Sequence, residues 1–289
     1  MQICVIGAGY VGVVTGVCLA NEGNMVTFVD VDREKVARLN NAEAPIYEEG
    51  LQDMLTENRQ HITATDDYDA VAESDMVFIC VGTPSRDDGG IDLSYVKEAA
   101  GQTGRQIGER WQLVVVKSTV VPGTTDGMVT PILERESGKT AGKDFDVAMN
   151  PEFLREGIAI QDFMQPDRIV IGVHSMRARE LLEKLYQPFD APLYVTSPST
   201  AEMVKYASNA LLATKISYAN EIGTLCKQYD VDTYQVMEAV GMDHRISPHF
   251  LRAGAGFGGS CFPKDVRALV AAGDSQDVPM QLLRSVLEV

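Results

Sequence analysis

Apolar and polar positions alternate in blocks along the first two hundred residues. Continuous apolar runs of strand length occur in "QICVIG", "MVTFVD", "DMVFICVG", "QLVVVKST" and "FDVAMN". Helix-like stretches such as "GYVGVVTGVCLANEG" and "DREKVARLNN" separate most of these runs. Strands that are apolar throughout are typical of a parallel sheet covered by helices on both faces. The pattern predicts a doubly wound α/β domain over residues 1–198, with "RIVIGV" and "LYV" as its last strands.

The pattern changes to a helical one at residue 199. The stretch from Ser199 to Tyr229 contains no proline and one glycine, and Ser199 with Glu202 forms a capping-box pattern at its start. Roughly 30 helical residues would span about 45 Å, far above the usual length. A helix of that length is typical of a spine between domains or a subunit interface. With "TYQVMEAV" and "DVRALVAAG" after it, the stretch predicts an α-helical central domain over residues 199–289.

Length and composition limit the classes of partner. The 289 residues suit two domains, and the net charge of −16 gives a surface that repels nucleic acid and anionic membranes. No run of about 18 apolar residues occurs, so we expect no membrane span. The N-terminus enters "MQICVIG" without a basic leader, and we therefore expect cytoplasmic residence.

The five cysteines are scattered and include no CxxC pair. This argues against a disulfide framework and against a zinc site, and no metal is expected. Cys4, Cys18, Cys80 and Cys226 lie in strand-like or helix-like runs and are expected to be buried. Cys261 differs, because "GFGGSCFPKD" places it among glycines and near Lys264. Exposure, a backbone that can close on a ligand and a nearby cation suit a reactive thiol.

A glycine motif follows the first strand. In "GAGYVG", Gly7 allows a tight turn, Gly9 lets the backbone approach a pyrophosphate, and Gly12 lets helix and strand pack closely. Asp30 ends the second strand 18 residues after Gly12, where a carboxylate accepts ribose hydroxyls and repels a 2′-phosphate. Asp32 is a second candidate for this ribose contact, and the alternative for Asp30 is that it is a solvated acid in a turn. The motif predicts a Rossmann-like domain that binds NAD rather than NADP.

Small polar residues follow several later strands. They lie in "VGTP" (81–84), "KSTVVPG" (117–123) and "NPEFLREG" (150–157), where a parallel sheet binds its ligands. We expect Thr83, Ser118 and Thr119 to face the nicotinamide, although each one could be an ordinary turn residue.

Three polar residues share one face of the long helix. Glu202, Lys205 and Asn209 are spaced i, i+3 and i+7. Such a stripe can be the solvated side of the helix. Alternatively it lies in the interior, where Lys205 would supply a cation that stabilises an alkoxide.

Together these motifs resemble the UDP-glucose/GDP-mannose dehydrogenase family over essentially the whole chain. The motifs are "GAGYVG", "VGTP", "KSTVVPG", "NPEFLREG", "EMVKYASNALLATKISYANEI" and "GGSCFPKD". The "CFPKD" form and "NPEFLREG…DFMQPDRIVIG" look most similar to the UDP-glucose 6-dehydrogenases of that family.

The resemblance implies oxidation of a primary alcohol to a carboxylate by two NAD⁺, without release of the aldehyde. Cys261 matches the nucleophile that forms a thiohemiacetal and then a thioester, which water cleaves. The expected reaction converts UDP-glucose to UDP-glucuronate. The alternatives are the same chemistry on GDP-mannose or a UDP-N-acetylhexosamine, or a non-catalytic NAD-binding, dimerising fragment. Simple 2-hydroxyacid dehydrogenases are disfavoured because they need no cysteine nucleophile.

The resemblance also assigns residues. Lys205 matches the residue that stabilises the alkoxide and oxyanion, and Asn209 and Asp265 match its partners, which orient the sugar and a water. Glu152 matches a base that acts through water, and Thr119 matches a residue that helps to hold that water. The implied cofactor contacts are Gly7, Gly9, Tyr10, Val11, Gly12, Asp30, Lys35, Gly82, Thr83, Pro84, Ser118, Thr119, Glu156 and Lys264. The implied substrate contacts are Glu152, Phe153, Leu154, Arg155, Glu156, Lys205, Asn209, Arg245, Phe250, Leu251, Arg252, Ala253, Gly254 and Gly258.

Two departures from the family pattern bear on these expectations. Ala253 and Ala255 stand where relatives often carry other small residues or proline, which leaves the fit of the sugar phosphate open. The sequence stops at Val289, whereas family members continue into a second α/β domain. We therefore expect a truncated chain that binds NAD and forms a homodimer through the long helix, with little turnover.

Overall fold

The computed structural model describes all residues from Met1 to Val289, and they form two compact units. The first unit comprises Met1–Thr83 and Leu93–Met203, and the second comprises Pro84–Asp92 and Val204–Val289. The expected boundary at residues 198 and 199 coincides with the start of the long helix, whereas the first unit continues for one further helical turn.

The first unit is built on an eight-stranded sheet in the order β3-β2-β1-β4-β5-β6-β7-β8. The strands are β1 (Gln2–Ile6), β2 (Met25–Val29), β3 (Ile62–Thr65), β4 (Met76–Ile79), β5 (Leu113–Val116), β6 (Asp146–Met149), β7 (Ile169–Gly172) and β8 (Leu193–Thr196). Pairing is parallel throughout except between β6 and β7. The predicted doubly wound sheet is confirmed, with one antiparallel step where the chain returns from β6 to β7.

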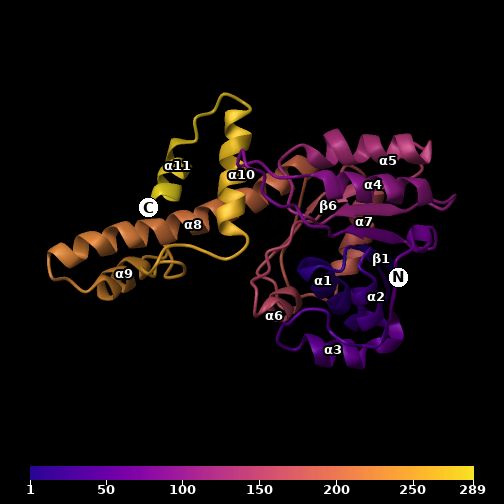
Figure 1. The fold of residues 1–289 in the computed structure, drawn as a ribbon, viewed down its shortest axis with the longest axis horizontal. Coiled ribbons are helices and arrows are strands. Elements are labelled where there is room, and N and C mark those ends of the chain that lie inside the picture. Colours follow the sequence, from indigo (N-terminus) through magenta and orange to yellow (C-terminus); the bar gives the residue numbers. More distant parts are fainter. The chain divides into compact units, whose positions relative to one another are not determined.

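Helices cover both faces of this sheet, as predicted (Figure 1). In Figure 1, α4 and α5 lie together on one side of the sheet, and α1 and α2 lie on the other. The helices are α1 (Tyr10–Asn21), α2 (Arg33–Asn40), α3 (Leu51–Glu57), α4 (Ser94–Gln106), α5 (Thr130–Ser137), α6 (Ala159–Met164) and α7 (Met176–Tyr186). Short helical turns lie at η1 (Arg59–His61), η2 (Tyr68–Val71) and η3 (Thr125–Val129), and η3 is a π-helical turn that leads directly into α5. Strands β4 to β7 are buried at every position, which explains why their sequences are apolar except at Asp146, the first residue of β6.

The second unit is helical. It consists mainly of α8 (Pro198–Gln228, whose first turn belongs to the first unit), α9 (Thr233–Gly241), α10 (Phe262–Asp274) and α11 (Gln281–Glu288). Helix α9 lies alongside α8 in Figure 1, and Ala219, Met237 and Leu251 form a small core between them. Ser217 in α8 donates a hydrogen bond to the carbonyl of Val286 in α11 over 3.0 Å. The long helix expected from the sequence is therefore confirmed at 31 residues.

The predicted capping box at the start of α8 is wrong. The helix begins at Pro198, and the Ser197 hydroxyl accepts the Thr200 amide over 3.3 Å. The Glu202 carboxylate instead accepts hydrogen bonds from the amides of Gly123 and Thr125, at 2.6 and 2.8 Å. A carboxylate that caps a neighbouring segment has the same sequence signature as one that caps its own helix.

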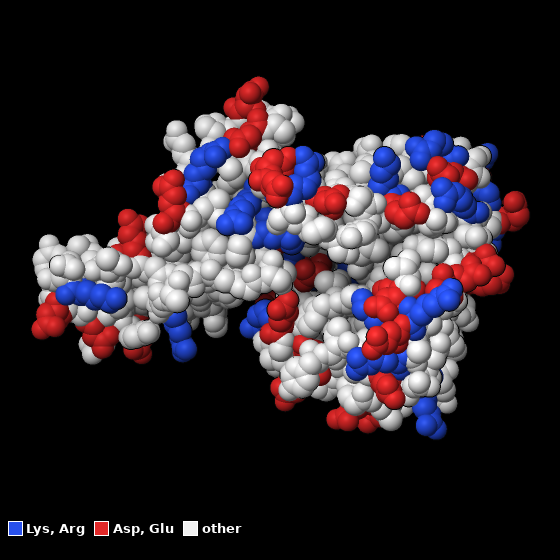
Figure 2. Space-filling view, in the orientation of Figure 1, with Lys and Arg blue, Asp and Glu red and all other residues white.

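Acidic and basic side chains are mixed on the face of the molecule drawn in Figure 2. Figure 2 shows basic side chains interspersed with acidic ones over the face in view. None of the helices combines the length and the apolar composition that a membrane span requires.

Candidate active site

The glycine motif forms the turn between β1 and α1. Gly7 has φ +98°, and a Cβ atom there would lie 3.0 Å from the Cys80 carbonyl oxygen. A Cβ on Gly12 would lie 1.9 Å from the Gly7 carbonyl oxygen, so only glycine fits. No atom lies within 4 Å of the Cβ position of Gly9, the residue that precedes α1. The turn is therefore tightly packed against the protein at Gly7 and Gly12 and open at Gly9. Tyr10 and Val11 are the first residues of α1, and the N-terminus of a helix suits a pyrophosphate.

Asp30 and Asp32 have different tasks beside this turn. One Asp30 oxygen accepts the Ala8 amide over 2.6 Å and the other accepts the Asp32 amide over 2.9 Å. Asp32 caps α2 by accepting the amides of Glu34 and Lys35. Asp30 thus lies against the glycine turn, as a ribose ligand requires, whereas Asp32 is engaged in its own helix. Together the open turn and Asp30 fit an NAD cofactor.

The segments after β4 and β5 meet at the same edge of the sheet. Ile79 pairs with Val116, and the Ser118 hydroxyl donates to the Val81 carbonyl over 2.7 Å. Gly82 is exposed with open space at its Cβ position, Thr83 is buried, and Thr119 is half-buried. Pro84, by contrast, belongs to the second unit. The structure therefore brings the glycine turn and four of the predicted strand-end residues to one edge.

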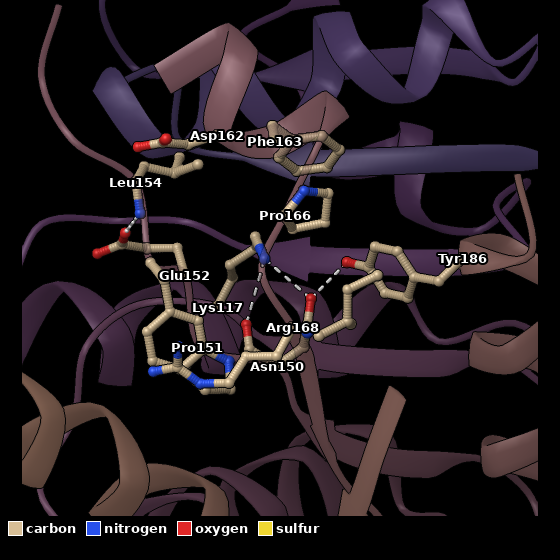
Figure 3. A pocket seen from close by; sticks show the side chains of 12 residues that line it. Lys117, Asn150, Pro151, Glu152, Leu154, Asp162, Phe163, Pro166, Arg168 and Tyr186 are labelled. Carbon is tan, nitrogen blue, oxygen red and sulfur yellow. Dashed lines mark hydrogen bonds between the residues drawn. The ribbon is translucent and has the colours of Figure 1, made fainter. Parts of the chain in front are cut away.

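The loop after β6 starts from a buried polar cluster that the sequence does not indicate. The Lys117 ammonium donates to Asn150 Oδ1 over 2.9 Å, and the Tyr186 hydroxyl donates to the same oxygen over 2.5 Å (Figure 3). Asn150 Nδ2 in turn donates to the Val170 carbonyl over 2.8 Å. Burial raises the pKa of the nearby Cys80 thiol to about 12, and the Lys117 charge acts in the opposite direction. These contacts fix Asn150 between β5, β7 and α7.

Residues Glu152 to Glu156 follow this cluster. Glu152 is buried, lines a small cavity of about 50 Å³ with Lys117, and accepts the Leu154 amide over 2.6 Å. The Phe153 ring lies 4.1 Å from the Arg168 guanidinium carbon. Arg155 forms an ion pair with Asp162. Glu152, Phe153 and Arg155, three of the five predicted substrate contacts in this loop, are thus engaged with protein partners.

Cys261 immediately precedes α10 in the second unit. The thiol is half-buried, and Sγ lies 3.6 Å from the Ser260 hydroxyl. Gly256 and Gly259 adopt positive φ angles of +109° and +80°, and nothing lies within 4 Å of the Cβ position of Gly258. The first turn of α10 directs its peptide N–H groups toward this end of the helix and adds positive potential there.

Asp265 joins α10 to the long helix. Its carboxylate accepts Asn209 Nδ2 and Lys264 Nζ, each over 2.6 Å. Asp265, Asn209 and Lys205 are all buried, as is Glu202. The interpretation of the stripe on α8 as a solvated face is therefore wrong.

The remaining predicted substrate residues lie in the segment between α9 and α10. Arg245 is exposed and paired with Asp243 at 2.5 Å. Phe250 has φ +63°, and its ring packs edge-on against Phe262 at 6.1 Å between centroids. Leu251 is buried in the small core, and the Gly254 amide donates to Asn220 Oδ1 over 2.6 Å. Arg252 is exposed and Ala253 is half-buried.

The predicted catalytic residues divide between the units. Thr119 and Glu152 lie in the first unit, and Lys205, Asn209, Cys261 and Asp265 lie in the second. Cys4, Cys18 and Cys80 are buried, and burial raises the pKa of each of these thiols. No cluster of three His, Cys, Asp or Glu side chains that could hold a metal is present.

Comparison with known proteins agrees with the resemblance. The NAD binding domain model of the UDP-glucose/GDP-mannose dehydrogenase family matches residues 1–190, and the central domain model of that family matches residues 199–289. The chain is 45% identical to the UDP-glucose 6-dehydrogenase AglM of Haloferax volcanii, covering 100% of this chain and 69% of that protein. It is also 45% identical to the UDP-glucose 6-dehydrogenase TuaD of Bacillus subtilis, and this match covers 99% of this chain and 62% of that protein.

Two further relatives are covered to a similar extent. GDP-mannose 6-dehydrogenase of Pseudomonas aeruginosa is 43% identical, over 99% of this chain and 67% of that protein. The structure of a UDP-glucose dehydrogenase from Pyrobaculum islandicum superposes with a TM-score of 0.95 at 48% identity, covering 99% of this chain and 67% of that one. The chain thus spans about two thirds of the length of the relatives it matches. The match to an NAD binding domain confirms the expected cofactor, and the chain belongs to the UDP-glucose/GDP-mannose dehydrogenase family of oxidoreductases.

Proposed function

We propose that the protein containing this chain oxidises UDP-glucose to UDP-glucuronate with NAD⁺ as the hydride acceptor. The observation that carries the proposal is the setting of Cys261. It is a half-buried thiol in a glycine-rich loop at the start of α10, one turn before the buried Asp265–Asn209 pair. The other four cysteines are buried, so Cys261 is the thiol that a sugar carbon can reach.

The residues act in sequence on the C6 carbon of the glucose. Two NAD⁺ molecules supply the oxidising power by accepting one hydride each. Lys205 stabilises the alkoxide as the alcohol proton passes to solvent water, and loss of the first hydride from C6 gives the aldehyde. The Cys261 sulfur then forms a bond to the aldehyde carbon while the thiol proton passes to the aldehyde oxygen. Loss of the second hydride leaves a thioester on Cys261. Glu152 takes a proton from the attacking water, which Thr119 helps to hold, and the C–S bond breaks to release the carboxylate and the thiol.

The choice of UDP-glucose rests on the relatives and on the "CFPKD" motif. The GDP-mannose relative is almost as similar, so parallel assays must separate the substrates. NADH formation should be measured with UDP-glucose, GDP-mannose and UDP-N-acetylmannosamine. UDP-glucose should give the highest kcat/KM. A preference for another sugar would overturn the substrate, and NADH binding without oxidation of any of the three would favour a non-catalytic role.

We further propose that two copies of the chain associate through α8. Leu211, Tyr218 and Leu225 recur every seven residues on this helix and are 62%, 48% and 54% exposed. Apolar residues at that spacing form one stripe on a helix, which suits packing against a second helix.

We also propose that the protein works in the cytoplasm. All five cysteines are free, and free thiols suit a reducing compartment.

A further inference from the structure

A buried carboxylate outside the predicted site connects two loops that carry predicted site residues. Glu48 lies between α2 and α3 and is only 5% exposed. Its oxygens reach residues more than one hundred positions later in the sequence. A buried carboxylate is costly unless it is well bonded, so its partners indicate what it does.

Three hydrogen bonds satisfy Glu48. Oε1 accepts the Ala159 amide over 2.7 Å. Oε2 accepts the Gly157 amide over 2.9 Å and the Tyr10 hydroxyl over 2.5 Å. Hydrogen bonds to an ionised acceptor are shorter and stronger than neutral ones. Glu48 therefore ties the end of the 150–157 loop to the first residue of α1.

Tyr10 completes this clasp, which we define as Glu48, Tyr10 and Gly157. The Gly157 amide also lies 3.3 Å from the Tyr10 hydroxyl oxygen. Burial and the hydrogen bond to Glu48 both raise the pKa of Tyr10, so the phenol keeps its proton at neutral pH and stays a donor. Gly157 has φ +95°, which suits glycine and turns the chain toward α6.

The loop that supplies Glu48 is itself fixed. Arg38 in α2 donates a hydrogen bond to the Ala44 carbonyl. Gln52 in α3 accepts the Ala44 amide over 2.9 Å and donates to the Ala42 carbonyl over 2.8 Å. The segment that leads to Glu48 is thus held by side chains from α2 and α3.

The opposite end of the 150–157 loop is held independently. Asn150 is fixed by Lys117 and Tyr186, as described above. The segment between Asn150 and Gly157 is therefore anchored at both ends, and it carries Glu152 and Glu156.

We infer that Glu48 is a positioning residue for the dehydrogenase reaction. Its carboxylate holds the 150–157 loop against the start of α1, so that the loop keeps a fixed place beside the glycine turn. This role rests on the proposed function, because it matters for catalysis only if Glu152 and its neighbours act on the substrate.

The test compares Glu48→Gln with Glu49→Gln in the chain of residues 1–289. Gln keeps the shape of Glu48 but has only one acceptor oxygen. Its NH₂ group would face a donor where the second Glu48 oxygen accepts a hydrogen bond. Glu49 is the exposed neighbour on the same loop and serves as the matched control. Amide hydrogen exchange across residues 150–164 should become about tenfold faster in Glu48→Gln and stay unchanged in Glu49→Gln.

Binding and turnover give the second measurement. The dissociation constant of NADH, from its fluorescence, should change less than about twofold, because the glycine turn itself is intact. In the protein containing this chain, kcat at saturating substrate should fall about tenfold or more, since small displacements of catalytic groups are costly. If Glu48→Gln fails to fold, Glu48→Asp decides the matter, because it keeps the charge but cannot span both amides.

The two measurements separate the two claims. Unchanged exchange in the 150–164 segment would overturn the clasp, whatever the activity. Faster exchange with unchanged kcat would overturn the positioning role. A protein that oxidises no nucleotide sugar at all would refute the proposed function and with it the role in catalysis, whereas the exchange result would still decide whether Glu48 holds the loop.

Discussion

Asn209 Nδ2 donates a hydrogen bond to Asp265 Oδ2 over 2.6 Å, which joins the long helix α8 to the first turn of α10. Both side chains are buried, and the Asp265 amide lies 2.8 Å from the Cys261 carbonyl oxygen. The bond therefore fixes the turn that carries the proposed nucleophile.

Removal of the Asn209 donor should destabilise this turn. Asn209→Ala leaves a buried carboxylate oxygen with one partner fewer, which costs about 1–3 kcal/mol. Thermal unfolding followed by circular dichroism should show a lower midpoint for this variant, and alkylation of Cys261 should change in rate. Gln228→Ala, an exposed change at the end of the same helix, is the control. Equal midpoints and equal alkylation rates for the two variants would contradict the assignment.

Cofactor preference should depend on Asp30 and not on Asp32. Asp30→Asn keeps an acceptor for the Ala8 amide but removes the charge that repels a 2′-phosphate. Its preference for NADH over NADPH should fall by on the order of tenfold or more, measured by fluorescence titration. Asp32→Asn preserves the cap of α2 and should leave the preference unchanged. If the Asp32 variant alone changed the preference, the assignment of the ribose ligand would be reversed.

Stability should vary with pH through Glu202. Burial raises the pKa of this carboxyl above its ordinary value of 4.5, although hydrogen bonds from Thr125 and Gly123 act in the opposite direction. The folded chain then holds the proton more tightly than the unfolded chain, so the stability contributed by Glu202 falls as pH rises from 4.5 to the raised pKa.

Glu202→Gln isolates this effect. Urea unfolding followed through the single tryptophan, Trp111 of the first unit, gives the unfolding free energy at each pH. The advantage of the parent protein over Glu202→Gln should shrink as pH rises above 4.5. The exposed change Glu180→Gln should show no such trend, and an advantage that grew with pH would contradict the argument.

Self-association should depend on the apolar stripe of α8. Leu211→Glu or Tyr218→Glu places a charge where two helices would meet, and each should convert a dimer to a monomer in sedimentation velocity. Leu282→Glu, an equally exposed change on α11, should leave the dimer intact. A monomeric parent protein, or dissociation by the α11 change alone, would rule out α8 as the interface.

The fold was largely predictable because the central strands are buried on both faces and therefore apolar at nearly every position. The sequence pattern does not predict β3, "ITAT", because this edge strand leaves three of its four residues partly or fully exposed and carries two threonines. The antiparallel step between β6 and β7 has no sequence signal either, since strand direction depends on the path of the connecting loop.

Candidate site residues could be selected from the sequence where a residue type is unusual for its surroundings. Glycines after a strand, an acid at the end of the second strand and a thiol in a glycine loop all meet that condition. Glu48 does not, because a glutamate in "YEEG" looks like an ordinary solvated residue. Its importance comes from contacts with Gly157 and Ala159, which are 109 and 111 positions away. In the sequence, Lys117 likewise looks like an ordinary residue at the end of a strand. Only the tertiary structure shows that it is buried beside Asn150.

The central claim is that one sulfur and the nicotinamide act on the same sugar carbon. The most direct measurement is the amount of NADH formed per UDP-glucose consumed, in the protein containing this chain and in its Cys261→Ser variant. We expect two NADH per sugar with no free aldehyde, and loss of the second NADH in Cys261→Ser, with Cys226→Ser still giving two. One NADH with released aldehyde, or unchanged turnover in Cys261→Ser, would contradict it.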